Sequence, residues 1–293
     1  MNNLKLKTML EQFFIEDIGE GDVSSHPLFQ RTDLGTFHFI AKEAGIFCGV
    51  DVIETGFSLI DSKIEVEVKR QDGDKVDRGD VLAEISGPMG SLLQGERVVL
   101  NLIQRMSGVA STTYQIVEAV KDSGVRICDT RKTTPGLRMM EKYAVTCGGG
   151  YNHRFGLYDC VMLKDNHLSF AGGITNAVNI VKNKLGHTVK IEVEIESKKQ
   201  MLEAIEAGVD IIMFDNRTPE EIAEWISYVP KYIVTEASGG ISPENVKDYA
   251  HTGVHYISLG YLTHSYKSLD ISAKVTTKSG SGCPETAGIC QNA

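Results

Sequence analysis

The sequence predicts an α/β protein with two parts: a small unit of sheet and helices, followed by a closed or nearly closed barrel of parallel strands. Before residue 110, short runs of alternating polar and apolar residues are separated by turn residues, which is typical of a small sheet. After residue 110, short β-branched runs alternate with segments of helical periodicity, which indicates parallel strands joined by helices. About six such repeats favour a barrel. A doubly wound sheet stays possible, because periodicity does not show closure.

Length and composition indicate a folded chain with a substantial core. The chain has 293 residues, of which 42% are hydrophobic and 24% charged, as expected for one large domain or two ordinary ones. The formal net charge is −9, from 30 Lys and Arg against 39 Asp and Glu. This charge argues against nucleic acid or an anionic membrane as a partner, because those partners select basic surfaces. It does not exclude a small anionic substrate bound in a local basic pocket.

The elements of the first part follow from local patterns. Residues 1–14 have the spacing of an amphipathic helix and lack the apolar core of a secretory signal. Alternation predicts strands at residues 37–40, 63–68 and 81–85, with Gly-containing turns between the last two. Apolar residues at helical spacing predict a helix over residues 91–105. This half is therefore expected to form a sheet covered by helices.

The second part repeats a strand and a helix several times. β-branched runs predict strands at residues 125–128, 160–163, 189–193, 211–214, 232–235 and 256–259. Segments of helical period predict helices at residues 112–121, 137–147, 174–185, 198–207, 219–228 and 243–250. No apolar run reaches the roughly 18–20 residues that a membrane-spanning helix needs.

Polar and charged residues lie at the carboxyl end of each predicted strand of the second part or directly after it. They are Asp129-Thr130-Arg131-Lys132, Lys164-Asp165-Asn166-His167, Glu192 and Glu194, Asp215-Asn216, Glu236-Ala237-Ser238-Gly239-Gly240 and Gly260. Because the carboxyl ends of barrel strands share one face, where active sites are built, these residues are predicted to meet in one site. Helix caps or solvated loops would explain one or two of the groups, but not the whole set.

The stretch of residues 129–167 is basic within an acidic chain. It contains six Lys and Arg against four Asp and Glu, a net +2 that leaves −11 for the rest of the chain. Arg suits bidentate recognition of carboxylate or phosphate, and Lys supplies a compact charge. A small polyanion is therefore the predicted ligand of the cationic candidates in this stretch, which are Arg131, Lys132, His153, Arg154 and Lys164.

Glycines after the late strands indicate a phosphate site. Ser238, Gly239 and Gly240 follow the fifth predicted strand and precede a helix expected to start near Ser242. Gly260 follows the sixth strand. Glycine lets a ligand approach the backbone, and free N–H groups in such loops favour phosphate. The sequence has neither a GxxxxGK[ST] loop nor a strand-linked GxGxxG loop, which argues against an ordinary nucleotide-binding loop.

Glu194 and Asp215 supply carboxylates at neighbouring strand ends. Two such oxygen donors, together with substrate phosphates, are typical of a Mg²⁺ site, because Mg²⁺ keeps most of its waters. The same groups could instead orient Lys132 and Lys164 by ion pairing, or bind sugar hydroxyls. The sequence leaves these roles open.

Cysteine usage indicates a reducing compartment. The six cysteines, at positions 48, 128, 147, 160, 283 and 290, form no CxxC motif, which predicts neither a zinc site nor a dense disulfide framework. A reducing cytoplasm is the simplest location. Cys283 and Cys290 lie in a tail, residues 276–293, to which the sequence assigns no role.

Several motifs resemble those of one enzyme family. Residues 129–167 read DTRKTTPGLRMMEKYAVTCGGGYNHRFGLYDCVMLKDNH. This run is similar to the signature stretch of the quinolinate phosphoribosyltransferases, also called carboxylating nicotinate-nucleotide pyrophosphorylases. Similar to the family's other motifs are GERVVLNLIQRMSG (95–108), EVEIE (192–196), MFDN (213–216), EASGGI (236–241) and LTHSYKSLDI (262–271). The resemblance covers nearly the whole chain up to about residue 275.

The resemblance implies an N-terminal α/β sandwich domain at residues 1–110 and an open or incomplete, TIM-like α/β barrel with fewer than eight strands at residues 111–265. The remaining residues, 266–293, would return to the first domain. The family also implies a homodimer or higher homo-oligomer, in which the N-terminal domain of one subunit closes the barrel mouth of the other. Arg97 would then reach the site of the partner subunit.

The family's reaction implies roles for the candidate residues. Its substrates are quinolinate and 5-phosphoribosyl 1-pyrophosphate. With Mg²⁺ they give nicotinate mononucleotide, CO₂ and pyrophosphate in de novo NAD biosynthesis. The quinolinate carboxylates would bind to Arg131, His153, Arg154 and Arg97 of the partner subunit. The catalytic group, which includes the ribose or metal ligands, would consist of Lys132, Lys164, Glu194 and Asp215. Phosphate would bind to Ser238, Gly239, Gly240 and Gly260.

Three alternatives stay open. One is a phosphoribosyltransferase of the same fold that acts on another acceptor, such as the relative associated with molybdenum transport. Another is a Schiff-base lyase or aldolase, because Lys132 or Lys164 at a strand end could act as a nucleophile. The third is non-catalytic: residues 72–82 resemble the hairpin of biotin- or lipoate-carrying modules. That hairpin lacks the modifiable lysine in its turn, so it is interpreted as structural.

Overall fold

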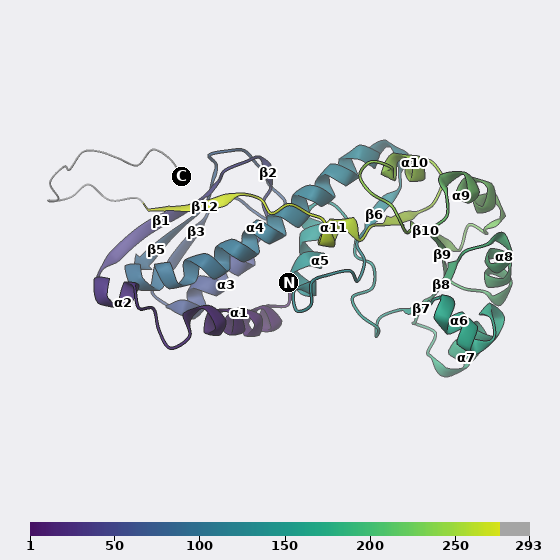
Figure 1. Cartoon of the computed structure of the whole chain (residues 1–293), viewed down its shortest axis with the longest axis horizontal. Helices are drawn as coiled ribbons and strands as arrows, with labels where there is room; N and C mark the ends of the chain where they lie inside the picture. Colours follow the sequence, from purple (N-terminus) through teal and green to yellow (C-terminus); the bar gives the residue numbers. More distant parts are fainter. Residues whose placement is uncertain (276–293) are drawn as a thin grey trace.

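The computed structural model describes residues 1–275. Figure 1 shows an elongated molecule with an antiparallel sheet and its helices at one end and a curved parallel sheet with outer helices at the other. The long helix α4 (Met89–Val120) runs from the first region into the second. Within the described residues, no helix combines the length and apolar character needed to cross a membrane. Cys283 and Cys290 lie outside the described residues.

The first region is built on an antiparallel sheet. In spatial order its strands are β12 (Ile271–Val275), β1 (Leu34–Ala41), β5 (Val81–Pro88) and β3 (Glu65–Val68). The short strands β2 (Gly45–Ile46) and β4 (Lys75–Val76) form a separate pair. Alternation along β1 puts Phe37 and Phe39 into the core, where the ring of Phe37 lies 5.8 Å from that of Phe57. β12 returns the chain to this sheet after the barrel, because it pairs with β1 along its length.

Helices α1 (Asn3–Ile18), α2 (Ser25–Leu28) and α3 (Val50–Ile60) belong to the same region. Helix α1 buries Leu6, Leu10 and Phe14, which recur at the spacing of one helical face. The pattern of residues 50–60 was not interpreted as a helix in the sequence. Asp72, more than twenty residues away, accepts hydrogen bonds from the N–H groups of Gly49 and Val50 at 2.6 and 3.0 Å and so caps α3.

Helix α4 is continuous where the sequence pattern predicts two helices, at 91–105 and 112–121, so that prediction was wrong. The interrupting Ser107-Gly108 pair suggests a break, because Gly weakens a helix. In the fold, the segment at Lys267 crosses α4 at this point. A Cβ on Gly108 would lie 2.3 Å from the Lys267 carbonyl oxygen. Gly108 therefore permits a close crossing of two segments and does not end the helix.

The second region is an open barrel. In the described chain, six parallel strands lie in the order β6 (Arg126–Cys128), β11 (Tyr256–Ser258), β10 (Val234–Ser238), β9 (Ile211–Asp215), β8 (Ile191–Ile195) and β7 (Val161–Leu163). β6 and β7 end the sheet and do not pair with each other, which confirms the predicted incomplete barrel. On its free side, β6 forms a single bridge from Cys128 to Tyr151.

Helices cover the outer face of the barrel (Figure 1). These are α6 (Asp165–Ala171), α7 (Ile174–Lys184), α8 (Lys198–Ala207), α9 (Pro219–Trp225) and α10 (Val246–Ala250), while α5 (Arg138–Cys147) and α11 (Tyr261–His264) lie beside α4, toward the first region. Short 3-10 helices η1 (Lys121–Ser123) and η2 (Ile226–Tyr228) follow α4 and α9. Helix α9 begins at a reciprocal cap, in which Thr218 accepts the N–H of Glu221 and Glu221 accepts the N–H of Thr218. Helix α8 has the predicted bounds.

Three strands extend farther toward their carboxyl ends than the sequence predicts, and this decides where their carboxylates lie. β8, β9 and β10 run to Ile195, Asp215 and Ser238, so Glu194, Asp215 and Glu236 lie within strands and not after them, while Glu192 lies within β8 as predicted. Successive strand residues face opposite sides of a sheet. Glu192 and Glu194 therefore both face the barrel interior, one beneath the other. Glu236 and Ser238 repeat this arrangement two strands away.

Candidate active site

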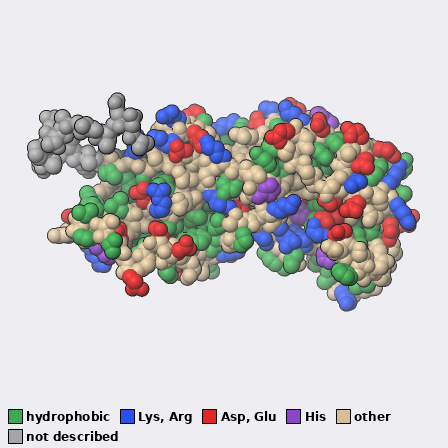
Figure 2. All heavy atoms as spheres, viewed as in Figure 1, with side chains coloured by type: hydrophobic (Ala, Val, Ile, Leu, Met, Phe, Trp, Pro, Cys, Tyr) green, Lys and Arg blue, Asp and Glu red, His purple; other side chains and the backbone are tan. Residues whose placement is uncertain are grey.

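A cavity of about 430 Å³ opens at the carboxyl ends of the barrel strands. This cavity is called the mouth of the barrel. It is lined by Thr130, Arg131, Lys132, His153, Arg154, Met162, Lys164, Glu194, Met213, Asp215, Asn216, Ser238, Gly239, Gly240 and Ser258. Ten of the twelve residues selected from the sequence are among them. Figure 2 shows Lys and Arg side chains gathered where the barrel meets the first region, while Asp and Glu are more frequent toward the far end.

The other two candidates lie elsewhere. Gly260 lies just outside the cavity lining, but a Cβ there would approach Cδ of Lys132 to 2.7 Å and Nε2 of His264 to 3.0 Å. Its lack of a side chain gives Lys132 room. Arg97 is exposed on α4 and does not line the cavity of its own chain. An isolated subunit thus does not bring Arg97 to the other candidates.

The cations of the mouth are not equivalent. Lys164, at the end of β7, is ion-paired with Glu194 of β8. Lys132 is held through its backbone, because its N–H donates to Thr130 Oγ1 at 3.0 Å and its carbonyl accepts from Thr263 Oγ1 at 2.7 Å. No residue within 1–275 forms a hydrogen bond or ion pair with the Lys132 ammonium. Partial burial, and then the nearby Arg154 and Arg138, lower the pKa of Arg131. An anion in this cavity would relieve that repulsion.

A buried ion pair fixes the segment that carries His153 and Arg154. Lys142 of α5 and Asp129, which follows β6, are both fully buried, with Nζ 2.5 Å from Oδ1. Asp129 also accepts the N–H of His153 at 2.8 Å and the amide of Asn152 at 2.6 Å. Lys142 completes the network by donating to the His153 carbonyl at 2.9 Å. Every polar contact of this pair therefore serves to position the segment.

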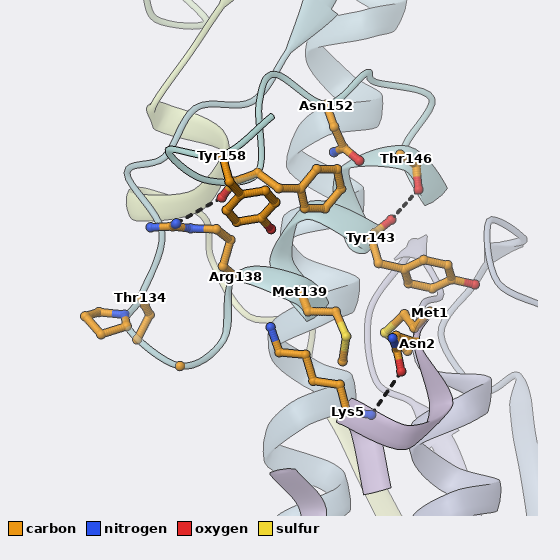
Figure 3. Close-up of a pocket in the computed structure, with 13 residues that line it drawn as sticks. Met1, Asn2, Lys5, Thr134, Arg138, Met139, Tyr143, Thr146, Asn152 and Tyr158 are labelled. Atoms are coloured by element: carbon orange, nitrogen blue, oxygen red, sulfur yellow. Dashed lines mark hydrogen bonds between the residues drawn. The ribbon is translucent and has the colours of Figure 1, made fainter. Parts of the chain in front are cut away.

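Two cations of the basic stretch do not reach the mouth. Lys142 is buried in its ion pair with Asp129 and is therefore not available to a ligand. Arg138 lines a different cavity of about 640 Å³ between α1 and α5, shown in Figure 3. Its guanidinium donates to the Phe155 carbonyl at 3.0 Å and to Thr133 Oγ1 at 3.0 Å, so it braces the loops on either side. The net +2 of the stretch overstates the charge that a ligand in the mouth would meet.

The floor of the mouth contains a histidine between two carboxylates. His153 Nε2 lies 3.1 Å from Glu192 and 3.6 Å from Glu236. Burial lowers the pKa of His153, but the hydrogen bond to Glu192 and the charges of both carboxylates outweigh it and raise the pKa above its usual value. Burial, followed by repulsion from Glu192, raises the pKa of Glu236 to about 7.

The glycine loop after β10 differs from its prediction. Helix α10 begins at Val246, not near Ser242, and has five residues, so its start does not directly follow the glycine loop. The loop itself is shaped for close approach. Gly239 and Gly240 have φ values of +92° and +64°. Asn216, at the end of β9, has φ +52° and donates its N–H to the Ser238 carbonyl at 2.9 Å. This tight junction brings backbone groups to the mouth.

Glu194 and Asp215 have the donor chemistry of a Mg²⁺ site. Both line the cavity as carboxylates on adjacent strands. Burial raises the pKa of Glu194, Lys164 opposes this, and the charge of Asp215 adds to it. A cation between the two carboxylates would reduce their repulsion. Oxygen donors of this kind fit Mg²⁺ better than a softer metal.

Comparisons with known proteins identify the family. The model of the quinolinate phosphoribosyl transferase N-terminal domain matches residues 22–107, and that of the C-terminal domain matches residues 109–274. The chain belongs to the quinolinate phosphoribosyltransferase family. A Bacillus subtilis (strain 168) protein named probable nicotinate-nucleotide pyrophosphorylase [carboxylating] is 53% identical over 276 residues, which are 94% of this chain and 95% of that protein.

Other relatives agree. Quinolinate phosphoribosyltransferase [decarboxylating] 1 of Nicotiana glauca is 39% identical over 294 residues, covering 93% of this chain and 83% of that protein. The crystal structure of NadC from Streptococcus pyogenes superposes with a TM-score of 0.91 at 40% identity, covering 94% of this chain and 98% of that one. The fold and the family are therefore shared along almost the whole described chain.

Sequence reasoning named several residues of this quinolinate phosphoribosyltransferase without giving them a role. Glu192 and Glu236 were noted only as strand-end carboxylates. Asn216 was named only as a strand-end residue and within a motif, and His264 only within a motif. The period-2 alternation of EVEIE was the available signal for Glu192, because it puts Glu192 and Glu194 on one face. No local pattern showed that His153, nearly forty residues earlier, lies between Glu192 and Glu236.

Replacement of Gly239 by alanine in this quinolinate phosphoribosyltransferase is expected to raise the KM for 5-phosphoribosyl 1-pyrophosphate strongly. A Cβ at Gly239 would lie 2.8 Å from the backbone nitrogen of Asn216 and would force the β9 and β10 ends apart. Gly240→Ala is the matched control, because it shares a positive φ but meets nothing within 4 Å. Steady-state kinetics and a thermal melt of both variants check this. Equal KM values in the two variants would contradict it.

Proposed function

We propose that the barrel mouth is the catalytic site for carboxylating phosphoribosyl transfer, as in the family to which the chain belongs. The reaction joins quinolinate to 5-phosphoribosyl 1-pyrophosphate and gives nicotinate mononucleotide, CO₂ and pyrophosphate in NAD biosynthesis. The observation that carries the proposal is the convergence of Arg131, His153 and Arg154 with two lysines and a glycine loop around one cavity. Such a cavity suits two small, strongly anionic substrates.

The acceptor carboxylates would bind the cations near the open edge between β6 and β7. Arg131 and Arg154 offer planar donors for carboxylates. Arg154 also donates to the Cys160 carbonyl at 3.1 Å, which fixes its direction. His153 lies beside them with its backbone held by Asp129. The donor's phosphate would lie across the barrel, against Ser238, Gly239, Gly240 and Gly260.

The chemical step needs positioning and charge but no protein nucleophile. The ring nitrogen of quinolinate attacks the anomeric carbon of the ribose, and the bond from that carbon to pyrophosphate breaks as positive charge develops on the sugar. Lys132 and Lys164 would stabilise the departing pyrophosphate, and Glu194 and Asp215 would hold the ribose hydroxyls. The positive pyridinium nitrogen stabilises the carbanion that is left on the neighbouring ring carbon when its carboxylate departs as CO₂. A proton from solvent then completes the ring.

Mg²⁺ would be held by Glu194 and Asp215 and mainly by the pyrophosphate of the substrate. When bound, it would neutralise charge on the leaving group. The lysines act on the same group from the protein side. A Schiff-base role for Lys132 or Lys164 is disfavoured, since Lys164 is engaged by Glu194 and the family reaction requires no imine.

Activity itself is the direct test. Incubation with quinolinate labelled at the carboxylate next to the ring nitrogen, 5-phosphoribosyl 1-pyrophosphate and Mg²⁺ should release labelled CO₂ and nicotinate mononucleotide in equal amounts. Nicotinate, which lacks that carboxylate, serves as the control acceptor. No CO₂ from quinolinate, together with product from another acceptor, would favour the molybdenum-transport-associated relative instead.

The working unit is proposed to be a homodimer or higher homo-oligomer, with Arg97 completing the site of the partner subunit. Supporting this, Arg97 is exposed and is not among the residues that line the cavity of its own chain. The unit formed by residues 1–110, together with the described residues 266–275 that return to it, would cover the mouth of the 111–265 barrel in the partner. A reducing cytoplasm is the proposed location, supported by the free thiols Cys48, Cys128, Cys147 and Cys160.

Subunit complementation checks the shared site. Arg97→Ala and Lys132→Ala variants, each nearly inactive alone, should regain activity when they are mixed and allowed to exchange subunits. One site of each mixed dimer would be intact, so random exchange should restore about a quarter of wild-type activity. Two Lys132→Ala preparations mixed together provide the control. No recovery despite proven exchange would remove Arg97 from the partner's site.

A further inference from the structure

We propose that Glu192 and Glu236 are positioning residues that keep His153 protonated and direct its second nitrogen toward the acceptor carboxylate. The proposal deepens the function given above and rests on it. The cluster lies in the barrel floor, beneath the mouth. His153 lines both the mouth and a second cavity below it, whereas Glu192 and Glu236 line only the lower one. The two carboxylates therefore act on substrate only through His153.

The geometry directs one ring nitrogen of His153, Nε2, toward the two carboxylates beneath the mouth. Nε2 of His153 lies 3.3 Å from Oε1 and 3.1 Å from Oε2 of Glu192, and 3.6 Å from Oε1 of Glu236. The exposed fractions of the three side chains are 12% for His153, 0% for Glu192 and 6% for Glu236. With Nε2 facing two carboxylates, Nδ1 is the nitrogen left for a ligand. An imidazolium can donate from both nitrogens, whereas a neutral ring can donate from only one.

The charges around the cluster require a cation at His153. Glu192 faces it from β8 and Glu236 from β10, and Lys142 faces it from α5. Asp129, after β6, contacts its backbone. The charges of Lys142 and Asp129, whose Nζ and Oδ1 atoms lie 2.5 Å apart, neutralise each other. The negative charges of Glu192 and Glu236 are therefore left without a compensating lysine. Within residues 1–275, Glu192 Oε2 and Glu236 Oε1 have no partner of good hydrogen-bond geometry, although both are buried. A protonated His153 is the group placed to compensate them.

The two buried carboxylates destabilise the fold, which favours a functional role for them over a structural one. Two buried carboxylates within 4.8 Å of each other repel. The pKa of Glu236 is raised to about 7 and is higher in the folded than in the unfolded chain, so this residue stabilises the fold only where it is protonated. That contribution is fully present below the ordinary pKa of a glutamate and is lost as the pH rises toward 7 and above.

The protonation state of His153 can be tested directly by measuring its pKa. In ¹⁵N-histidine NMR spectra of the intact wild-type protein, assigned with a His153→Gln variant, His153 is expected to titrate above the usual value for histidine. Glu192→Gln and Glu236→Gln should each lower that pKa. Glu196→Gln is the matched control, because Glu196 is an exposed carboxylate next to the same strand. A wild-type His153 that titrates at an ordinary or lower pH overturns the proposal, even if neither variant folds.

The kinetic readout separates positioning from simple structural support. Glu192→Gln and Glu236→Gln are expected to lower kcat/KM for quinolinate about tenfold to hundredfold, by analogy with carboxylates that orient metal-bound histidines. The KM for 5-phosphoribosyl 1-pyrophosphate should stay near wild type. The alkaline limb of kcat/KM for quinolinate should move to lower pH, because the imidazolium is lost earlier. Folded variants with an unchanged limb would contradict the proposal.

The Glu236→Gln variant is also expected to be more stable than the wild type at neutral pH, although it is less active. Its urea midpoint should match that of the wild type below about pH 4.5 and exceed it increasingly up to about pH 7, because glutamine cannot ionise. A midpoint lower than wild type at pH 8 would count against the proposal. Failure of the proposed function looks different: His153 would still titrate high, but His153→Gln would leave the quinolinate KM unchanged.

Discussion

Lys132→Ala is expected to lower kcat about 10²–10³-fold, the effect of removing one donor that stabilises developing charge in a transition state. Lys132 lies in the loop that follows β6 and lines the mouth. Its backbone is fixed by Thr130 and Thr263, so loss of the side chain should not move the loop. Its ammonium has no partner among residues 1–275, which leaves it free for the departing pyrophosphate. Initial rates of CO₂ release measure the effect.

The control for this loss is a lysine of the same region with no proposed role. Lys190 is 68% exposed and pairs with Asp210 at 2.8 Å, at the start of β8 and away from the mouth. Lys190→Ala should keep near-normal turnover. Lys132→Arg, which keeps the charge, should recover part of the activity, limited by the crowding at Gly260. If folded Lys132→Ala turns over at close to the wild-type rate, Lys132 does not belong to the catalytic group.

The largest loss of stability is expected from Lys142→Ala. Both charges of the Lys142–Asp129 pair are fully buried, and burial alone raises the pKa of Asp129 and lowers that of Lys142. Removing one partner leaves an uncompensated buried charge, which typically costs about 3–5 kcal/mol. The free energy of unfolding, measured by urea titration, should fall by about that amount. The segment that carries His153 and Arg154 would also lose its anchor, so the quinolinate KM should rise.

A double variant isolates the charge from the packing. Asp129→Asn combined with Lys142→Met removes both charges and keeps an acceptor for the N–H of His153. It should be more stable than Lys142→Ala, because no unpaired ion is buried. The exposed pair Lys190–Asp210 provides the surface comparison and should contribute about 0–1 kcal/mol. A Lys142→Ala loss no larger than that of Lys190→Ala would show that the buried pair is not the anchor.

Local patterns predicted most strands and helices of the barrel, because each strand or helix of an α/β repeat is formed by one short, continuous segment whose periodicity can be recognised. Helix α8 was predicted with its observed bounds. One error has a clear physical cause. Two helices were predicted where α4 is continuous, and the segment at Lys267 that packs against Gly108 lies far along the chain. Information of this kind exists only in the folded molecule.

The candidate site divides in the same way. Motifs and strand ends identified Arg131, Lys132 and Lys164 as residues near the carboxyl ends of strands, and the mouth contains them. Charge counting could not separate Lys132, whose ammonium is unpartnered in the described chain, from Lys142, which is fully buried against Asp129. Both are lysines in one basic stretch. Burial and pairing distinguish them, and neither property is encoded in a residue's immediate neighbours.

The chain by itself thus determined the α/β class, the family motifs and the set of charged residues available for a polyanion, because periodicity and residue chemistry are local properties. The acidic balance of −9 also belongs to the sequence, and a basic mouth coexists with it. Only the tertiary structure decided that α4 is one helix, that Arg97 does not line the cavity of its own chain, and that Glu192 and Glu236 both face Nε2 of His153. Each of these depends on contacts between residues distant in sequence, where the energetics of burial and charge pairing are set.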